Sequence, residues 1–339
     1  MVVRQPKEVV SIMGVVDTFL RHRQEETKGD RSYKHYHPSE FGKCLRTQQY
    51  KHYVELGYIE MAGEEESFSS QKIRLFDKGH NMHLRWQRDY FASMGVLRGI
   101  WKCLNPFCFS WQDDGTQRWE GGPTVDQKKQ MIDEGKTRVY GKEAKIGVFK
   151  PEACKCGCTE FEYHEITVVD EDLNMIGHAD LVLDFSRLDE KSFNGVRKSF
   201  ALDELPKEPI VADMKTINDW QFKGKVLKHG PHKEYQIQIA IYAYILGLKY
   251  GLIIYENKND STAAAYKVDM TPEVIETVKF QAKAMKKMAP LKLLPPPRPD
   301  DKSSSECKYC DFRSICHASS IWKDPEIDKK RNAFYKNLI

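Results

Sequence analysis

The sequence predicts an α/β fold class, with a mixed central sheet flanked by helices. Residues 209–216 and 252–255 are short apolar segments typical of strands, and residues 166–185 predict a β-hairpin around an acidic turn. Residues 234–248 carry apolar side chains at helical spacing, and Thr-Pro at 271–272 predicts the start of a further helix that ends near 288. Strands that alternate with helices in this way are typical of an α/β domain.

The N-terminal part of the chain is expected to be mainly helical, over residues 1–60. Ser39 follows Pro38 and predicts the N-cap of a helix that carries Cys44. A second helical stretch is expected from residue 76 to residue 91. These helices would precede the strands along the chain.

Composition limits the class of protein without defining its function. The chain has 339 residues, of which 40% are hydrophobic and 11% aromatic, so it can bury one large core and global disorder is excluded. The net charge of +4 permits a polyanionic partner but does not require one. One basic stretch is either a solvated loop or part of a binding surface; it contains Lys223, Lys225, Lys228, His229, His232 and Lys233.

Four segments of different character divide the chain: residues 1–100, a cysteine-rich insertion at 101–165, a core at 166–290 and a second cysteine segment at 291–339. The apolar runs fall short of the roughly 18 residues that span a bilayer, and charges interrupt the N-terminus, so neither a membrane span nor a signal peptide is expected. The expected location is therefore the cytoplasm. In that reducing compartment nine cysteines are better explained as metal ligands than as disulfides.

Two carboxylates and a lysine form the first candidate site. Asp213 and Lys215 end the strand predicted at 209–216, and because alternate residues of a strand share a face, they should project together. Asp180, in Gly-His-Ala-Asp, is expected on a strand or its turn. Two carboxylates can hold Mg²⁺ or Mn²⁺ together with water and a substrate phosphate. Asp-x-Lys by itself is better explained by an ion pair at the end of an exposed strand, and only the order of all the motifs favours a catalytic site.

Cysteines near the two ends of the chain form a second candidate site. Cys44 lies near the start, and Cys307, Cys310 and Cys316 follow as Cys-x2-Cys-x5-Cys. Four thiolates suit either a tetrahedral Zn²⁺ or a [4Fe–4S] cluster, and ligand chemistry does not separate the two. Either group would tie the two ends of the chain together.

The insertion carries a third candidate site with five cysteines. Cys103-x4-Cys108 and Cys154-Lys-Cys156-Gly-Cys158 resemble the two halves of a zinc ribbon, in which four thiolates bind structural zinc. The second half lacks the usual Cys-x2-Cys spacing, so the choice among Cys154, Cys156 and Cys158 is open. A second cluster or unliganded thiols are the alternatives.

The order of these residues resembles the RecB-like branch of the PD-(D/E)XK nuclease superfamily. The resemblance covers residues 39 to 316 apart from the insertion. It rests on four short segments of the sequence: Phe76-Asp-Lys-Gly-His-Asn-Met-His83, Gly177-His-Ala-Asp180, Asp213-Met-Lys215-Thr216 and Gln238-Ile-Ala-Ile-Tyr242. It implies a restriction-endonuclease-like sheet. One upstream cysteine with a Cys-x2-Cys-x5-Cys tail is similar to the iron–sulfur subset of this family, which favours [4Fe–4S] over zinc at the chain ends.

The resemblance implies roles for individual residues. His83, Asp180 and Asp213 would bind the catalytic Mg²⁺ or Mn²⁺, with the carbonyl of Met214, and Lys215 would act near the attacking water. Gln238 and Tyr242, which share one face of a helix as an i,i+4 pair, would position the substrate or Lys215.

The activity implied is that of a metal-dependent deoxyribonuclease, most simply an exonuclease on single-stranded DNA or DNA ends. The chain has no Gly-x4-Gly-Lys-Ser/Thr loop, so it would act alone or beside a separate helicase or recombination protein. The alternative is a non-catalytic nucleic-acid-binding protein that keeps the fold as a scaffold. A cluster-based redox protein is a third hypothesis, but no flavin or nicotinamide motif supports it.

Overall fold

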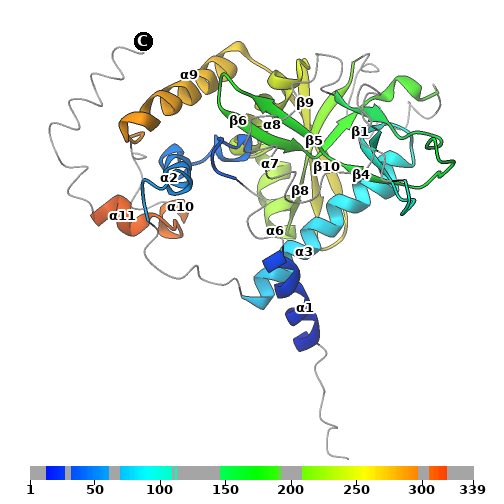
Figure 1. Ribbon diagram of the computed structural model, residues 1–339, viewed down its shortest axis with the longest axis horizontal. Coiled ribbons are helices and arrows are strands. Elements are labelled where there is room, and N and C mark those ends of the chain that lie inside the picture. The colour runs from blue at the N-terminus through cyan, green and yellow to red at the C-terminus, as the bar shows by residue number, and fades with distance from the viewer. Residues whose placement is uncertain are drawn as a thin grey trace, which may run out of the picture.

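A mixed β-sheet forms the centre of the molecule and helices flank it (Figure 1). The computed structural model describes residues 13–26, 32–60, 69–108, 111–112, 146–189, 191, 208–296 and 305–318. Within these residues the main sheet has eight strands, in the order β10-β9-β8-β7-β1-β2, with β3 and β4 also paired to β1. Its strands are β1 (Leu97–Cys103), β2 (Trp111–Gln112), β3 (Val148–Phe149), β4 (Phe161–His164), β7 (Leu181–Leu183), β8 (Ile210–Ile217), β9 (Tyr250–Asn257) and β10 (Ala263–Asp269).

The predicted hairpin is present as a separate pair, β5 (Ile166–Asp170) and β6 (Met175–Ala179), which runs directly into β7. Only β8 and β9 are parallel among the described strand pairs of the main sheet. Antiparallel β7 and parallel β9 therefore lie on either side of β8, which makes the sheet mixed. Central β8 carries Asp213 and Lys215.

Helical segments connect the parallel strands β8 and β9. After β8 come α6 (Asp219–Gln221), η5 (Phe222–Val226), α7 (Leu227–His229) and α8 (Lys233–Leu246). The long helix α8 packs on β8 and β9 and ends at Gly247, whose φ of 74° is the left-handed conformation that glycine adopts most easily. The basic stretch from Lys223 to Lys233, for which a solvated loop was one of two interpretations, is thus largely helical.

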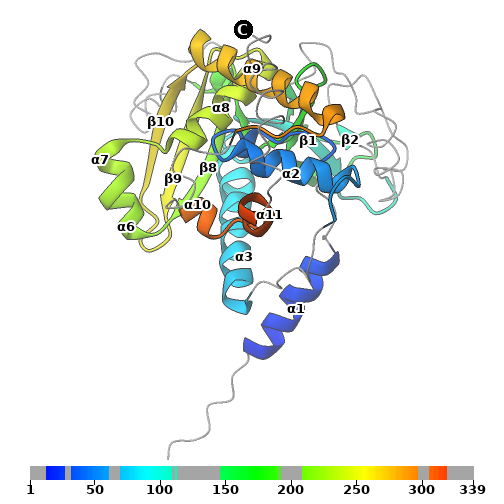
Figure 2. The same cartoon turned by 90° about the vertical axis from the view of Figure 1, so that its left-hand side faces the viewer.

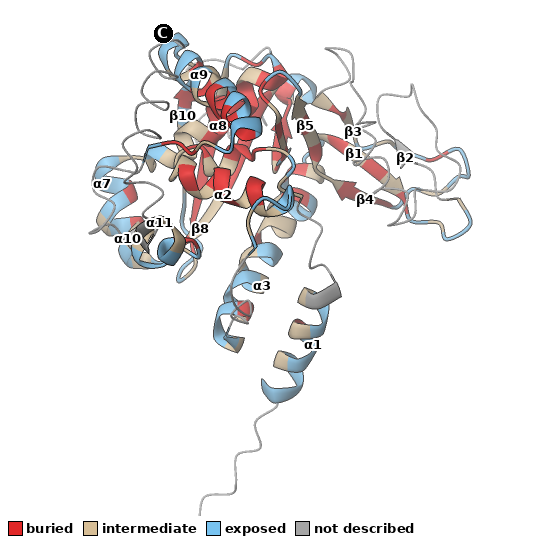
Figure 3. Ribbon diagram, turned by 60° about the vertical axis from the view of Figure 1, so that its left-hand side comes forward, coloured by how far each residue is buried: buried red, intermediate tan, exposed pale blue. Residues whose placement is uncertain are grey.

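The two faces of the sheet bury separate sets of apolar side chains. Val211 and Ile253 join the core that contains α8 and α9 (Pro272–Met288), whereas their neighbours Ala212 and Leu252 join the core on the opposite face. This alternation is the two-residue period of a strand with both faces covered. Figure 3 shows buried residues concentrated on the strands and on α8, while α1 (Met13–Glu26) is largely exposed.

The N-terminal helices agree with the prediction except at one cap. Pro38–Glu40 form a short 3₁₀ turn, η1, and α2 (Leu45–Glu55) begins with Cys44 as its N-cap. The prediction that Ser39 caps this helix was therefore wrong, because the proline starts a separate turn. The expected helix at 76–91 is longer, as α3 (Ser70–Leu84) followed by the π-helical η2 (Arg85–Ala92). The predicted Thr271 cap of α9 is present, since its side chain accepts from the backbone N–H of Val274.

The C-terminal segment returns to the N-terminal part of the chain. Helices α10 (Ser305–Lys308) and α11 (Arg313–Ala318) lie beside α2, as Figures 1 and 2 both show. Tyr50 of α2 stacks on Phe312, with ring centroids 5.1 Å apart and an interplanar angle of 12°. These rings belong to a small third core that joins the two ends of the chain.

The cysteine-rich segment continues directly from the core, because strand β1 lies within the main sheet and ends at Cys103. Residues 109–110 and 113–145 of this segment lie outside the described residues.

None of the helices in the described part of the chain is both long and apolar enough to cross a lipid bilayer.

Candidate functional site

Three polar side chains meet where β6 passes into β7 beside β8. Asp180 lies between β6 and β7, and the pairing of Leu181 with Ala212 brings it next to Asp213 in the middle of β8. The backbone N–H of Met214 donates to Asp180 Oδ2 at 3.1 Å. The carboxyl groups of Asp180 and Asp213 are close enough that each shifts the pKa of the other. The sheet therefore brings together two carboxylates that are 33 positions apart in the sequence.

Lys215 lies on the same face of β8 as Asp213, as strand alternation predicts. Its Nζ is 3.0 Å from Asp213 Oδ1 and 2.9 Å from Oδ2. Gln238 of α8 donates to the same Oδ1 at 3.1 Å. Oδ2 is buried and accepts no hydrogen bond of good geometry, so Asp213 keeps one oxygen on which a cation could be bound.

Tyr242 lies one helical turn beyond Gln238 and packs over the β6 strand. A Cβ atom at Gly177 would lie 2.9 Å from the Tyr242 hydroxyl and 3.1 Å from Pro38 Cδ, so only glycine fits there. The Tyr242 ring is 4% exposed, and burial raises the pKa of its hydroxyl. Gly177 thus permits the close packing of α8 that holds Gln238 beside Asp213.

His83 approaches the carboxylates from the last turn of α3. Its Nδ1 is 3.5 Å from Asp180 Oδ2, which also accepts a hydrogen bond from the backbone N–H of Met214. Burial and the neighbouring Lys215 lower the pKa of His83, which favours the neutral imidazole that binds metals. The six side chains expected around the catalytic cation are therefore gathered at one site: His83, Asp180, Asp213, Lys215, Gln238 and Tyr242.

A third carboxyl group, Glu165, lies at this site and was missed from the sequence. Gln87 of η2 donates through Nε2 to Glu165 Oε1 at 3.0 Å and to the backbone oxygen of Asp180 at 2.9 Å. The hairpin pairs Ile166 with Ala179, and one further step of this register places Glu165 opposite Asp180. Extending the predicted hairpin by one residue pair would have found it.

A buried ion pair fixes the helix that carries His83. Glu256 on β9 is 1% exposed and accepts hydrogen bonds from the side chains of Arg85 and Trp86, at the start of η2. A buried carboxylate needs such partners to remain charged. No local motif predicts this contact, because Arg85 and Glu256 are 171 positions apart in the chain.

Burial controls the electrostatics of the site. Burial, opposed by Lys215 and reinforced by Asp180, raises the pKa of Asp213 to about 7. Burial and then Glu165 raise the pKa of Asp180 to about 6, and burial also raises the pKa of Glu165. For Lys215, burial alone would lower the pKa, but Asp213 and Asp180 outweigh it and the pKa is raised. The charge of Lys215 thus does not fully compensate the buried carboxylates when they ionise. A divalent cation beside them would supply the remaining positive charge.

We expect Asp213→Asn to stabilise the fold at pH 8 in buffer without added Mg²⁺ or Mn²⁺. Because the folded-state pKa of Asp213 is raised above its ordinary 3.8, its favourable contribution is complete below pH 4 and is lost as pH rises through about 7. Asparagine cannot ionise and avoids that loss. A shift of roughly three pKa units at about 1.4 kcal/mol each sets an upper limit of about 4 kcal/mol on the gain.

Urea unfolding followed by circular dichroism at pH 4.5 and pH 8 measures this difference. The gain should be large at pH 8 and small at pH 4.5. Asp269→Asn is the matched control, because Asp269 is 67% exposed on the edge strand β10 and should unfold like the wild type at both values. An Asp213→Asn protein no more stable than the wild type at pH 8 would contradict the electrostatic account.

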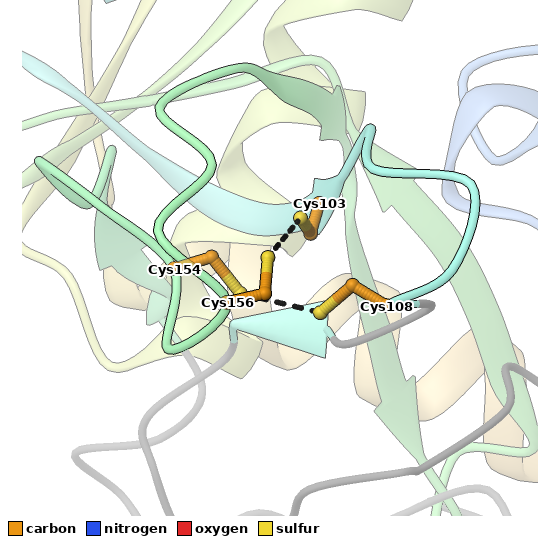
Figure 4. Close-up of side chains that lie close together, drawn as sticks. All are labelled: Cys103, Cys108, Cys154 and Cys156. Carbon is orange, nitrogen blue, oxygen red and sulfur yellow. Dashed lines mark hydrogen bonds between the residues drawn. The ribbon is translucent and has the colours of Figure 1, made fainter.

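The cysteines of the insertion converge on a single point (Figure 4). One sulfur atom from each of Cys103, Cys108, Cys154 and Cys156 lies within 4.8 Å of all the others. The Sγ–Sγ distances are 3.6 Å for Cys103–Cys156 and 3.5 Å for Cys108–Cys154. A tetrahedral Zn²⁺ with Zn–S bonds of about 2.3 Å places sulfurs roughly 3.8 Å apart, so this cluster of four cysteines could hold a metal ion.

This geometry shows which cysteines of the second half belong to the cluster of four. Cys154 and Cys156 belong to the cluster, whereas Cys158 Sγ lies 3.5 Å from the backbone oxygen of Glu160. The backbone N–H of Cys154 donates to the Cys158 oxygen, and that of Gly157 donates to the Cys154 oxygen. Gly157 has φ of 85°, so this tight turn depends on glycine. Cys158 closes the turn with its backbone rather than with its thiol.

The cysteines from the two chain ends line one common cavity, together with side chains of α2, α10 and α11. Arg46 Nη1 lies 3.5 Å from Cys316 Sγ, and Thr47 Oγ1 lies 3.4 Å from Cys310 Sγ. The backbone N–H of Cys44 donates to Glu306 at 2.7 Å, which joins α2 to α10. The contact that the sequence predicts between Cys44 and the C-terminal cysteine segment is therefore present.

The two cysteine sets differ in spacing. Among the described residues the four inserted cysteines bring their ligand atoms within 4.8 Å of one another, whereas neither the terminal cysteines nor the group His83, Asp180 and Asp213 brings three ligand atoms that close. Four thiolates suit either a zinc ion or a [4Fe–4S] cluster, so the terminal set is compatible with both.

Comparisons with known proteins provide no functional assignment. No protein-family model matches the chain, and no curated protein matches it. A solved structure described as "Crystal structure of SSO0001" aligns with 91% of this chain and 98% of its own at 14% identity, with a TM-score of 0.43. A likeness of that size carries no argument about function. The proposals for this chain therefore depend on its own residues.

Proposed function

We propose that the protein is a divalent-metal-dependent DNA nuclease of the RecB-like PD-(D/E)XK type, with a restriction-endonuclease-like core. The observation that carries the proposal is the convergence of Asp180, Asp213 and Lys215 beside the middle of β8. Carboxylates whose pKa values are raised by burial, beside a lysine, are typical of a catalytic site rather than of an exposed ion pair. The intact lysine also favours catalysis over the scaffold alternative.

His83, Asp180 and Asp213 would hold Mg²⁺ or Mn²⁺, with the Met214 backbone beside them. When bound, such a cation polarises a phosphoryl oxygen and lowers the pKa of water. Gln238 holds the Asp213 carboxylate in one orientation through Oδ1, and Glu256 anchors the helix of His83 through Arg85. Lys215, whose side chain is 21% exposed and whose ammonium group pairs with Asp213, would stabilise the negative charge that develops on the phosphate.

The cysteine sets are proposed as structural metal sites. Cys103, Cys108, Cys154 and Cys156 would hold zinc, because their sulfur spacing suits a tetrahedral ion. Cys44, Cys307, Cys310 and Cys316 would hold a [4Fe–4S] cluster, because they face a shared cavity and their order in the sequence is similar to the iron–sulfur subset. Neither set contacts the carboxylates in the described structure, which favours a role in folding.

Hydrolysis of a 5′-labelled single-stranded oligonucleotide tests the proposal directly. Protein purified anaerobically should degrade the strand with Mn²⁺ or Mg²⁺ and leave it intact when neither is added. A ladder of products over time would indicate an exonuclease. If the strand binds but is never cut with either metal, the scaffold alternative replaces the enzyme.

A further inference from the structure

Two exposed aromatic rings lie on elements that meet beyond the end of β8. Trp220 of α6 is 66% exposed and Phe76 of α3 is 53% exposed. We call the surface formed by Phe76, Lys78, Trp220, Lys225 and Lys258 the exit surface, because it follows directly from the strand that carries Asp213 and Lys215. Exposed aromatic faces beside lysines can stack on the unpaired bases of a single strand.

The path of α3 along β8 places Phe76 near Trp220. His83 lies beside Asp180 Oδ2, which accepts a hydrogen bond from the backbone N–H of Met214, and a Cβ atom at Gly79 would lie 3.6 Å from Thr216 Oγ1. Four residues of a helix rise about 6 Å, as do two residues of a strand. The helix runs antiparallel to β8, so each helical turn back toward the N-terminus corresponds to two strand residues further along β8. One further turn puts Phe76 level with the residue before α6. Figures 1 and 2 show α3 and α6 near the same end of β8.

Trp220 is held in its exposed position by its neighbours. Asn218 caps α6 by accepting from the backbone N–H of Gln221 at 2.8 Å. Asn257 donates to Asp219 Oδ1 at 2.7 Å, which ties α6 to the end of β9. Lys225 Nζ lies 4.7 Å from the Trp220 ring centroid. The ring therefore has a rigid support and a cation on it, so it can stack on a base with little loss of entropy.

Two lysines on the neighbouring elements, Lys78 of α3 and Lys258 just after β9, lack an acidic partner among the described residues. Lys78 Nζ donates to the backbone oxygen of Lys258 at 3.3 Å. Burial and then the charge of Lys78 lower the pKa of Lys258. Neither lysine has a carboxylate within ion-pair distance in the described part of the chain. A phosphate between them would supply the missing negative charge.

We propose that the exit surface binds single-stranded DNA that leads into the catalytic site, with bases stacked on Trp220 and Phe76 and a backbone phosphate held by Lys78 and Lys258. The proposal rests on the proposed nuclease function and names the surface that selects its substrate. Stacking requires a free base face, which single strands present and a paired duplex does not. The surface therefore favours a single strand over a duplex.

Binding of fluorescein-labelled oligothymidylate, followed by polarisation without added Mg²⁺ or Mn²⁺, tests the stacking. Trp220→Ala should weaken binding tenfold or more, since each stacked base contributes about 1–3 kcal/mol, and Trp220→Phe should remain within about threefold of the wild type. Affinity for a blunt duplex should not change. Phe280→Ala is the matched control, because Phe280 is 37% exposed on α9, away from this surface, and should bind normally.

Salt dependence separates the phosphate contacts from stacking. Replacing both Lys78 and Lys258 by Gln should reduce the slope of log affinity against log salt by about 0.7, because the two lysines share one phosphate contact on the single strand. Trp220→Ala should leave the slope unchanged. Lys249→Gln is the control, since Lys249 precedes β9 at its opposite end and pairs with Glu208.

The outcomes distinguish this surface from the nuclease itself. If Trp220→Ala binds oligothymidylate as tightly as the wild type, or weakens single strand and duplex equally, the exit surface is wrong even when the wild type cuts DNA. If binding depends on Trp220 but the wild type cuts nothing with Mn²⁺ or Mg²⁺, the surface stands and the nuclease function fails. Circular dichroism of each variant checks that it is folded.

Discussion

Asp213→Ala is expected to abolish Mg²⁺- or Mn²⁺-dependent DNA degradation while DNA binding persists. The substitution removes a carboxylate proposed to hold the cation and leaves the Lys215 ammonium without its partner. Loss of an essential ligand should lower the rate by at least about 10³-fold, because polarisation of the phosphate and activation of water are lost together. Single-turnover cleavage of a labelled strand measures the rate of hydrolysis. Fluorescence polarisation of the same strand measures DNA binding.

The control for this experiment is Asp269→Ala, which removes an exposed carboxylate that pairs only with its neighbour Lys267 on the edge strand. It should cut DNA at the wild-type rate. Degradation by Asp213→Ala at a rate near that of the wild type would remove the enzyme hypothesis. Because the side chain is buried, a melting curve for each variant shows whether a loss of rate is a loss of chemistry or of folding.

Cys310→Ser should destabilise the entire fold more than it alters the chemistry. A link between Cys44 and Cys307 closes a loop of 263 residues (307 minus 44). By the loop-entropy relation for disulfides, such a link stabilises by about 5–6 kcal/mol, similar to the roughly 5–15 kcal/mol that holds a whole domain. Removing one ligand should therefore lower the melting temperature sharply and remove the visible absorption of an iron–sulfur cluster.

Cys158→Ser is the matched control for this variant, because its thiol lies outside both ligand sets. It should melt like the wild type and keep both metals. Thermal denaturation, visible absorption and metal analysis of anaerobically purified proteins together decide the matter. A Cys310→Ser protein that is colourless yet melts normally would contradict the stabilising role of the terminal cysteines.

Much of the local structure could be predicted because it depends on neighbours in the sequence. The alternation at Asp213 and Lys215, the pairing of Gln238 with Tyr242 on one helix face and the Thr271 cap all follow from short-range periodicity. The Ser39 cap was wrong for an equally local reason, since a proline can start a 3₁₀ turn as readily as an α-helix.

What the sequence did not predict depends on contacts between distant segments. Gln87 joins Glu165 to the Asp180 backbone, and Glu256 binds Arg85 from a strand far along the chain. The choice of Cys154 and Cys156 over Cys158 required the fold of the turn at Gly157. Such contacts are set by strand register and helix placement, which no short motif encodes.

Calorimetric titration with Mn²⁺ tests the central claim most directly, namely that Asp180 and Asp213 share one divalent cation beside Lys215. The account predicts saturable Mn²⁺ binding to the wild-type protein. This binding should be lost in both Asp180→Ala and Asp213→Ala and should be unchanged in Asp269→Ala. Mn²⁺ that binds equally to the wild type and to both site variants would contradict it.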